Sequence, residues 1–118
     1  QVLQNILHHE PEKAREVTKI LTERIENSDA PEKMDKYYVA AKTGTSLKPK
    51  ENAPGYSKSL YTSIIGFLPA TEPKILIYVL VDSASGGGVW GSTIAAPVFK
   101  EIATQVARMM NLKPDKNL

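Results

Sequence analysis

The sequence predicts an α+β fold, with an antiparallel sheet of about three strands flanked by an N-terminal and a C-terminal helix. Two observations predict it. Three segments rich in apolar, β-branched and aromatic residues lie between two segments with helical periodicity. The connections between successive strand segments are short, which favours antiparallel neighbours over parallel strands joined by long crossovers.

The N-terminal part is expected to be helical from Pro11, a residue suited to the first turn of a helix. Apolar residues then recur at helical spacing between charged ones: Ala14, Val17, Ile20, Leu21 and Ile25. The helix is expected to end near residues 27–29. Glu10 precedes a proline and is biased away from helix, so residues 2–9 are expected to form a separate short helix or turn.

The middle of the chain contains three strand candidates, at residues 37–43, 60–68 and 75–81. The polar residues 46–56 are expected to form a loop, and residues 69–73 a turn. The third candidate consists of consecutive apolar residues, which predicts a strand buried on both faces.

The C-terminal helix is expected over residues 95–110, with Pro97 in its first turn. Its predicted apolar stripe comprises Val98, Ile102, Gln105, Val106 and Met109. A strand buried on both faces needs a layer on each side. The terminal helices can cover one face, so we expect the other layer to come from outside these elements.

Composition narrows the classes of function. The chain has 118 residues, no cysteine, and a net charge of +2 from 15 basic and 13 acidic residues. Such a balanced charge argues against binding to nucleic acid or to an anionic membrane surface. The absence of cysteine excludes disulfides and cysteine-ligated metal sites. His8 and His9 are adjacent and lack further ligands at suitable spacing, so we expect no metal and no cofactor.

No stretch reaches the ~20 apolar residues that span a bilayer. No signal peptide is visible, and the chain starts at Gln1 without an initiator Met. We therefore expect any targeting segment to lie upstream of this chain.

The strongest candidate site is Lys42-Thr43-Gly44-Thr45, at the end of a predicted strand. Gly44 allows a ligand to approach the backbone closely, while Lys42 and the threonine hydroxyls suit a carboxylate or a proton shared with a serine. Taken alone, the four residues are weak evidence for a site and fit an edge strand with a solvated lysine better. No serine in the chain has a lysine three positions later, so we find no internal nucleophile with a helical base.

A wider comparison of motifs makes the site more specific. Residues 38–46 resemble the third signature motif of the penicillin-binding transpeptidases. Residues 63–70 resemble the strand that follows this motif, and residues 95–102 resemble the start of the family's C-terminal helix. Residues 112–115 look like the usual exit from that helix. The similarity covers about residues 10–116 and points to class B penicillin-binding proteins, most of all to the cell-division (septal) and sporulation types.

This resemblance implies a peptidoglycan D,D-transpeptidase, which cross-links cell-wall stem peptides through an acyl-serine intermediate and binds β-lactams. It implies that Lys42 joins the proton network of the nucleophile, and that Thr43 and Thr45 hold the substrate carboxylate. The backbone N–H of Thr45 would be one of two oxyanion-hole donors, and Gly44 would keep the strand edge open for substrate. The family usually has Gly where Ala41 stands, so the extra methyl either narrows the cleft or faces the core.

The resemblance also implies that residues 1–118 are the C-terminal portion of a transpeptidase domain, with the nucleophile-bearing part upstream. That part covers the second face of the sheet in the family, so we expect this chain to expose an apolar sheet face and to be inactive alone. The implied partners are stem peptides ending in D-Ala-D-Ala, β-lactams, the missing N-terminal part of the domain and divisome proteins. The implied location is the cell envelope, on the extracytoplasmic face of the bacterial cytoplasmic membrane.

Two alternatives within the same fold stay open. One is a non-catalytic module that senses β-lactams or docks a division partner. The other is a serine β-lactamase, since these enzymes share a similar Lys-Thr-Gly strand. Residues 66–69 and 95–102 favour the transpeptidase over the β-lactamase.

Overall fold

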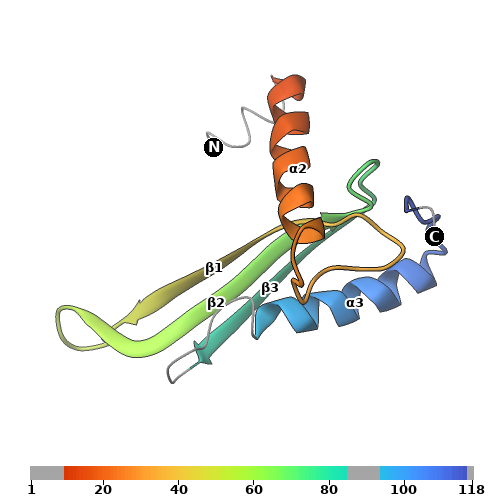
Figure 1. Cartoon of the computed structure of the whole chain (residues 1–118). Coiled ribbons are helices and arrows are strands. Elements are labelled where there is room, and N and C mark those ends of the chain that lie inside the picture. The colour runs from red at the N-terminus through yellow and green to blue at the C-terminus, as the bar shows by residue number, and fades with distance from the viewer. Residues whose placement is uncertain (1–9, 85–93, 117–118) are drawn as a thin grey trace.

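The structure, a computed structural model, describes residues 10–84 and 94–116. Its elements follow the predicted order of a helix, three strands and a helix, which confirms the α+β fold (Figure 1). They are α2 (Pro11–Glu26), β1 (Ala40–Pro49), β2 (Tyr56–Leu68), β3 (Ile75–Ala84) and α3 (Ala95–Met109). The helix or turn predicted for residues 2–9, with His8 and His9, lies outside the described residues.

The three strands form one antiparallel sheet in the order β1-β2-β3, so β2 is central. The register places Lys42 opposite Ile65, and Ile65 opposite Tyr78. Side chains in one such row share a face of the sheet.

The first hairpin is longer than predicted. β1 begins at Ala40 rather than at residue 37 and continues to Pro49, while β2 already begins at Tyr56. Most of the predicted loop at residues 46–56 therefore shrinks to a short turn. The loop was predicted from polar composition, but the backbone pairing continues through these residues. The hairpin end is largely exposed, so its strands do not need alternating apolar residues.

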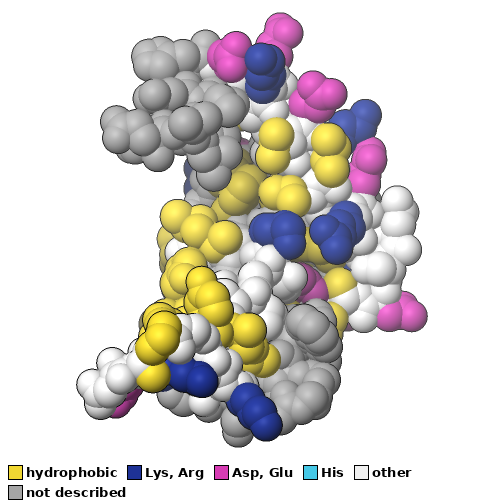
Figure 2. All heavy atoms as spheres, turned by 90° about the vertical axis from the view of Figure 1, so that its left-hand side faces the viewer, with side chains coloured by type: hydrophobic (Ala, Val, Ile, Leu, Met, Phe, Trp, Pro, Cys, Tyr) yellow, Lys and Arg dark blue, Asp and Glu magenta, His cyan; other side chains and the backbone are white. Residues whose placement is uncertain are grey.

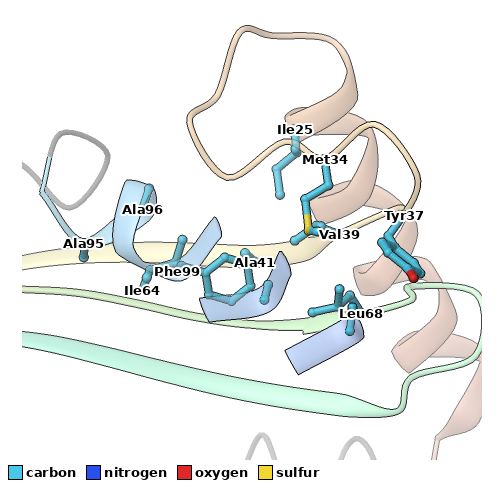
Figure 3. Packing of buried hydrophobic residues seen from close by; sticks show 12 residues of the cluster. Ile25, Met34, Tyr37, Val39, Ala41, Ile64, Leu68, Ala95, Ala96 and Phe99 are labelled. Carbon is cyan, nitrogen blue, oxygen red and sulfur yellow. The ribbon is translucent and has the colours of Figure 1, made fainter. Parts of the chain in front are cut away.

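Helix α3 packs against β2 and β3 and forms the main core with them. The predicted stripe of α3 is wrong. Val98, Ile102 and Met109 are exposed, and the buried positions are Ala95, Ala96, Phe99, Ala103 and Ala107. Alanines let the helix approach the sheet closely, and Phe99 fills the remaining space between them. Figure 3 shows Phe99 within this cluster, beside Ala41 and Ile64.

Helix α2 meets the sheet only near its C-terminal end (Figure 1). Within its predicted apolar stripe, Ile25 is buried, whereas Val17 and Ile20 are exposed. An amphipathic helix with an exposed apolar stripe is unusual unless another element covers it.

The sheet face away from α3 carries exposed apolar side chains, as expected. We call this face the open face and define it by Ile65, Leu76, Tyr78 and Leu80, whose exposed fractions lie between 44% and 68%. Hydrophobic side chains gather along one side of the molecule in Figure 2. Among the described residues, α3 covers one face of β3, and the second layer predicted for this strand does not come from residues 10–84 and 94–116.

The C-terminal segment ties the start of β1 to the rest of the molecule. Asp115 Oδ1 accepts a hydrogen bond from the backbone N–H of Tyr38 at 2.7 Å, and its Oδ2 accepts one from the hydroxyl of Thr71 at 2.9 Å. Lys116 Nζ pairs with Glu26 Oε2 at 2.7 Å, at the end of α2. These contacts fix the entry of the chain into the strand that carries the candidate site.

Candidate active site

The predicted site residues lie together on β1, at the edge of the described sheet. Lys42, Thr43, Gly44 and Thr45 pair with β2, and the sheet of residues 10–84 and 94–116 has no strand on the far side of β1. Their other edge points away from β2, and the N–H and C=O groups of an edge strand can accept a further extended segment.

Alternation along β1 divides the four residues between the two faces of the sheet. Lys42 and Gly44 lie on the open face, in the rows of Ile65 and Ser63, whereas Thr43 and Thr45 lie toward the α3 side. The Lys42 side chain is exposed, and its Nζ donates a hydrogen bond to the backbone carbonyl of Thr43 at 2.8 Å. The ammonium group therefore lies beside the strand edge, where it can meet a group approaching the open face.

Gly44 permits the close approach that the sequence predicts. A Cβ atom at this position would lie 3.1 Å from the Ser63 hydroxyl oxygen, a tight contact and the only one within 4 Å from residues 10–84 and 94–116. The absence of a side chain leaves the surface between Lys42 and Ser63 open to a ligand.

The structure shows on which side of β1 the methyl of Ala41 lies, at the position where the family usually has Gly. Its side chain is 7% exposed and belongs to the buried cluster, so the methyl faces the core. It lies opposite Gly66, where a Cβ atom would come within 2.7 Å of Ala41 Cβ and 2.9 Å of Phe99 Cζ. The methyl of Ala41 thus fills space that Gly66 leaves empty.

A pocket of about 270 Å³ adjoins the motif. The end of α2, residues 30–32 and the first residues of β1 line it, and its charged lining residues are Arg24, Glu32 and Lys42. We call it the Glu32 pocket. Glu32 is 5% exposed, and its Oε1 is fully buried with no hydrogen-bond partner among the described residues. Sequence reasoning missed Glu32, because a glutamate in a polar stretch after a proline gives no local signal of burial.

An ion pair spans the sheet at the far end of β1. Lys48 Nζ lies 2.6 Å from Asp82 Oδ1, and 5.2 Å from the ring centre of Tyr61 on the intervening strand. The hydrogen bond to Asp82 raises the pKa of Lys48 above its ordinary value. The pair links both edge strands across β2, beyond the motif.

Within residues 10–84 and 94–116, no group of three or more His, Cys, Asp or Glu side chains is placed to hold a metal ion. In the same part of the chain, no helix is both long and apolar enough to cross a bilayer.

Comparison with known proteins identifies the family. The model of the penicillin binding protein transpeptidase domain matches residues 2–104. The chain belongs to this family.

Individual relatives agree. The chain is 35% identical over 83 residues to the peptidoglycan D,D-transpeptidase FtsI of Buchnera aphidicola subsp. Baizongia pistaciae, covering 70% of this chain and 14% of that protein. It is 38% identical over 82 residues to the stage V sporulation protein D of Bacillus subtilis, covering 69% of this chain and 12% of that protein. The resemblance to class B penicillin-binding proteins is confirmed.

A solved structure of the same family shares the fold. The structure matches the transpeptidase domain of penicillin-binding protein 3 from Burkholderia pseudomallei with a TM-score of 0.73 and 31% identity, over 91% of this chain and 33% of that one. The chain thus spans about a third of that domain structure, and only 12% to 14% of the two curated relatives. The roles of Lys42, Thr43, Gly44 and Thr45 remain predictions.

Proposed function

We propose that this chain is the C-terminal portion of the transpeptidase domain of a peptidoglycan D,D-transpeptidase. The complete enzyme cross-links stem peptides through an acyl-serine intermediate and is acylated by β-lactams. The nucleophile lies in upstream sequence, and this chain supplies the strand that binds the substrate carboxylate and completes the oxyanion hole.

The observation that carries this proposal is the position of Lys42 beside the open face. The exposed side chains of Leu76, Tyr78 and Leu80 form an apolar surface of the kind that another part of a protein normally covers. A nucleophile-bearing element that packs there comes to the same face as the Lys42 ammonium. A positive charge beside a serine hydroxyl favours its deprotonated form, which is the attacking species in acyl transfer.

The rest of the motif suits the substrate. Thr43 and Thr45 hold the terminal carboxylate of D-Ala-D-Ala or of a β-lactam through their hydroxyl groups. The backbone N–H of Thr45 donates to the carbonyl oxygen that becomes negative in the transition state. The open edge of β1 at Gly44 accepts the substrate as an added strand.

The partners and location follow from the same proposal. The upstream part of the domain covers the open face, and stem peptides and β-lactams are the ligands. The complete protein works at the extracytoplasmic face of the bacterial cytoplasmic membrane, with divisome proteins as partners.

The test uses the full polypeptide that contains this chain. Intact-mass spectrometry after incubation with benzylpenicillin should show one adduct, and peptide mapping should place it on a serine upstream of these 118 residues. Lys42→Met should lower the acylation rate constant by about 10²-fold or more, because it removes a group in the proton network. Thr45→Val should slow acylation roughly tenfold or more through loss of a hydrogen bond to a charged group. The matched control is Lys50→Met, which removes an exposed lysine just after β1.

Several outcomes would contradict the proposal. An adduct within these 118 residues would reveal a nucleophile in this chain. No adduct on the full polypeptide would favour a non-catalytic module. Rapid release of the drug as its hydrolysed form would favour a β-lactamase. Unchanged acylation of the Lys42→Met variant would remove the role of that residue.

A further inference from the structure

Residues 112–116 follow α3 and lie beside the segment that leads into β1; we call them the C-terminal clamp. The hydroxyl of Tyr37 donates a hydrogen bond to the backbone carbonyl of Leu112 at 2.7 Å. The backbone N–H of Lys116 donates one to the carbonyl of Lys36 at 3.2 Å. The clamp therefore holds the approach to β1 at several points, although 75 positions separate Tyr37 from Leu112 along the chain.

Asp115 is the member of the clamp that contacts the end of this approach. Its Oδ1 accepts a hydrogen bond from the backbone N–H of Tyr38 at 2.7 Å, and the carbonyl of Tyr38 accepts one from the N–H of Ala70 at 2.8 Å. Its Oδ2 accepts a hydrogen bond from the hydroxyl of Thr71 at 2.9 Å. Both backbone groups of Tyr38 are thus held just before β1 begins at Ala40, one by the clamp and one by the turn after β2.

The anchor at Tyr38 lies close to the residues that carry the proposed chemistry. Lys42 follows Tyr38 after roughly 13 Å, at the rise of an extended strand. Pairing with β2 fixes the register of β1, but a strand can still twist about its own axis, and the sheet of residues 10–84 and 94–116 has no strand on the far side of β1. The orientation of its first residues therefore depends on how the entry is held. A carboxylate makes a firm anchor, because the hydrogen bonds it accepts are roughly twice as strong as neutral ones.

We propose that Asp115 is a positioning residue for acylation. Through the N–H of Tyr38 it fixes the start of β1, so that the ammonium group of Lys42 meets the nucleophile in the geometry the reaction needs. A displacement of about 1 Å at a reacting group can slow a reaction about 10²-fold. The inference rests on the proposed function and adds to it a residue that touches neither the substrate nor the nucleophile.

The position of Asp115 also predicts which step it affects. Lys42, in the proton network, is close to the anchor, whereas Thr45, which holds the substrate carboxylate, lies further along the paired strand. Loss of the anchor should therefore lower the maximal rate of acylation more than it raises the concentration of drug needed for half-maximal rate.

The experiment measures acylation of the full polypeptide by benzylpenicillin. Intact-mass spectra of samples quenched over time give the rate constant at each drug concentration, and hence the maximal rate constant and the half-saturating concentration. The time course of adduct formation reports on the folded molecules, so partial unfolding of a variant lowers the amount of adduct and leaves this rate constant unaffected. A double-mutant cycle compares the wild type, Asp115→Ala, Lys42→Met and the combined variant.

Three further variants make the comparison specific. Thr71→Val removes the other hydrogen bond of the same carboxylate and leaves the one to Tyr38 in place. Asp115→Asn keeps an oxygen that can accept from the N–H of Tyr38. Asp115→Glu keeps both acceptor oxygens on a longer side chain, and it replaces Asp115→Ala in the cycle if that variant does not fold.

We expect Asp115→Ala to lower the maximal rate constant about tenfold in the wild-type background and less than about twofold in the Lys42→Met background, since its effect passes through Lys42. Asp115→Glu should lower it about threefold in the wild-type background and not at all beside Lys42→Met. Asp115→Asn and Thr71→Val should stay within about twofold of the wild type, because the bond to Tyr38 survives in both.

Three results would overturn the inference. The first is a maximal rate constant for the Asp115 variant of the cycle that equals the wild-type value. The second is the same loss in the Lys42→Met background, which would indicate a general structural role. The third is an equal loss in Thr71→Val. If the wild type is not acylated, or Lys42→Met is not slowed, the proposed function itself fails; a slow Lys42→Met variant beside a neutral Asp115→Ala variant removes this inference alone.

Discussion

The contact between Gly66 and Ala41 allows a quantitative test of how the strand is held. Replacing Gly66 by Ala would place a methyl group 2.7 Å from Ala41 Cβ, 2.9 Å from Phe99 Cζ and 3.0 Å from the carbonyl oxygen of Ala40. All three distances are at or below the shortest that such atoms normally show. One of these neighbours is backbone, so a simple side-chain rotation cannot relieve the clash.

The expected change in the free energy of unfolding for Gly66→Ala follows from two opposing effects. Overpacking a well-filled core typically costs about 1–3 kcal/mol. Replacing Gly by Ala also reduces the entropy of the unfolded chain, which contributes roughly 0.4–1 kcal/mol in favour of folding. Since three close contacts occur at once, we expect Gly66→Ala to lower the free energy of unfolding by about 2 kcal/mol net.

A double-mutant cycle identifies the responsible contact. Ala41→Gly restores the residue usual in the family and should cost about 1–2 kcal/mol alone, through a lost methyl and a more mobile unfolded chain. Combined with Gly66→Ala it removes the shortest contact, so the two costs should not add, and the coupling should be about 1 kcal/mol. Phe99 and the Ala40 carbonyl remain close, so the rescue is partial.

The assay is urea unfolding of the full polypeptide for the wild type, both single variants and the double variant. Gly44→Ala is the matched control, because among the described residues its Cβ would meet the movable Ser63 hydroxyl and nothing else within 4 Å. We expect it to cost less than about 1 kcal/mol. Strict additivity of the two substitutions, or a neutral Gly66→Ala, would refute the packing argument.

Two further predictions concern stability. Thr62→Val removes a buried hydroxyl oxygen that has no hydrogen-bond partner among the described residues, so the free energy of unfolding measured in urea should rise by about 1 kcal/mol; a fall would mean that the hydroxyl has a partner. Lys48→Met removes an ion-pair partner of Asp82. The hydrogen bond to Asp82 raises the pKa of Lys48 above its ordinary 10.5, so the wild type should be more stable than the variant below that pH. This difference should vanish as the pH rises through the raised pKa, and should be absent in an Asp82→Asn background; a difference independent of pH would contradict the assignment.

The uncovered surfaces of this chain share one explanation. The open face and the exposed stripe of α2, which includes Val17 and Ile20, both carry exposed apolar side chains. The chain matches about a third of the related transpeptidase domain. Under the proposed function, the upstream part of the domain covers these surfaces, and the apolar composition of β3 reflects that larger fold.

Much of the architecture could be predicted from local sequence. The order of elements, the antiparallel connections and the Lys42-Thr43-Gly44-Thr45 motif depend on short-range properties, namely propensity, periodicity and loop length. The apolar run at residues 75–81 also indicated two faces with an affinity for other layers, of which α3 supplies one.

Only the tertiary structure decided which surfaces meet. The prediction for α3 assigned the larger apolar residues Val98 and Ile102 to the buried stripe. Close packing on the sheet instead buries the small Ala103 and Ala107 around Phe99. The burial of Glu32 likewise depends on residues 30–32 lying beside the start of β1, an arrangement set by the path of the intervening residues 33–39. Sequence by itself determined the strand and its chemical groups, while packing decided which of them are buried, because burial depends on neighbours that no local pattern specifies.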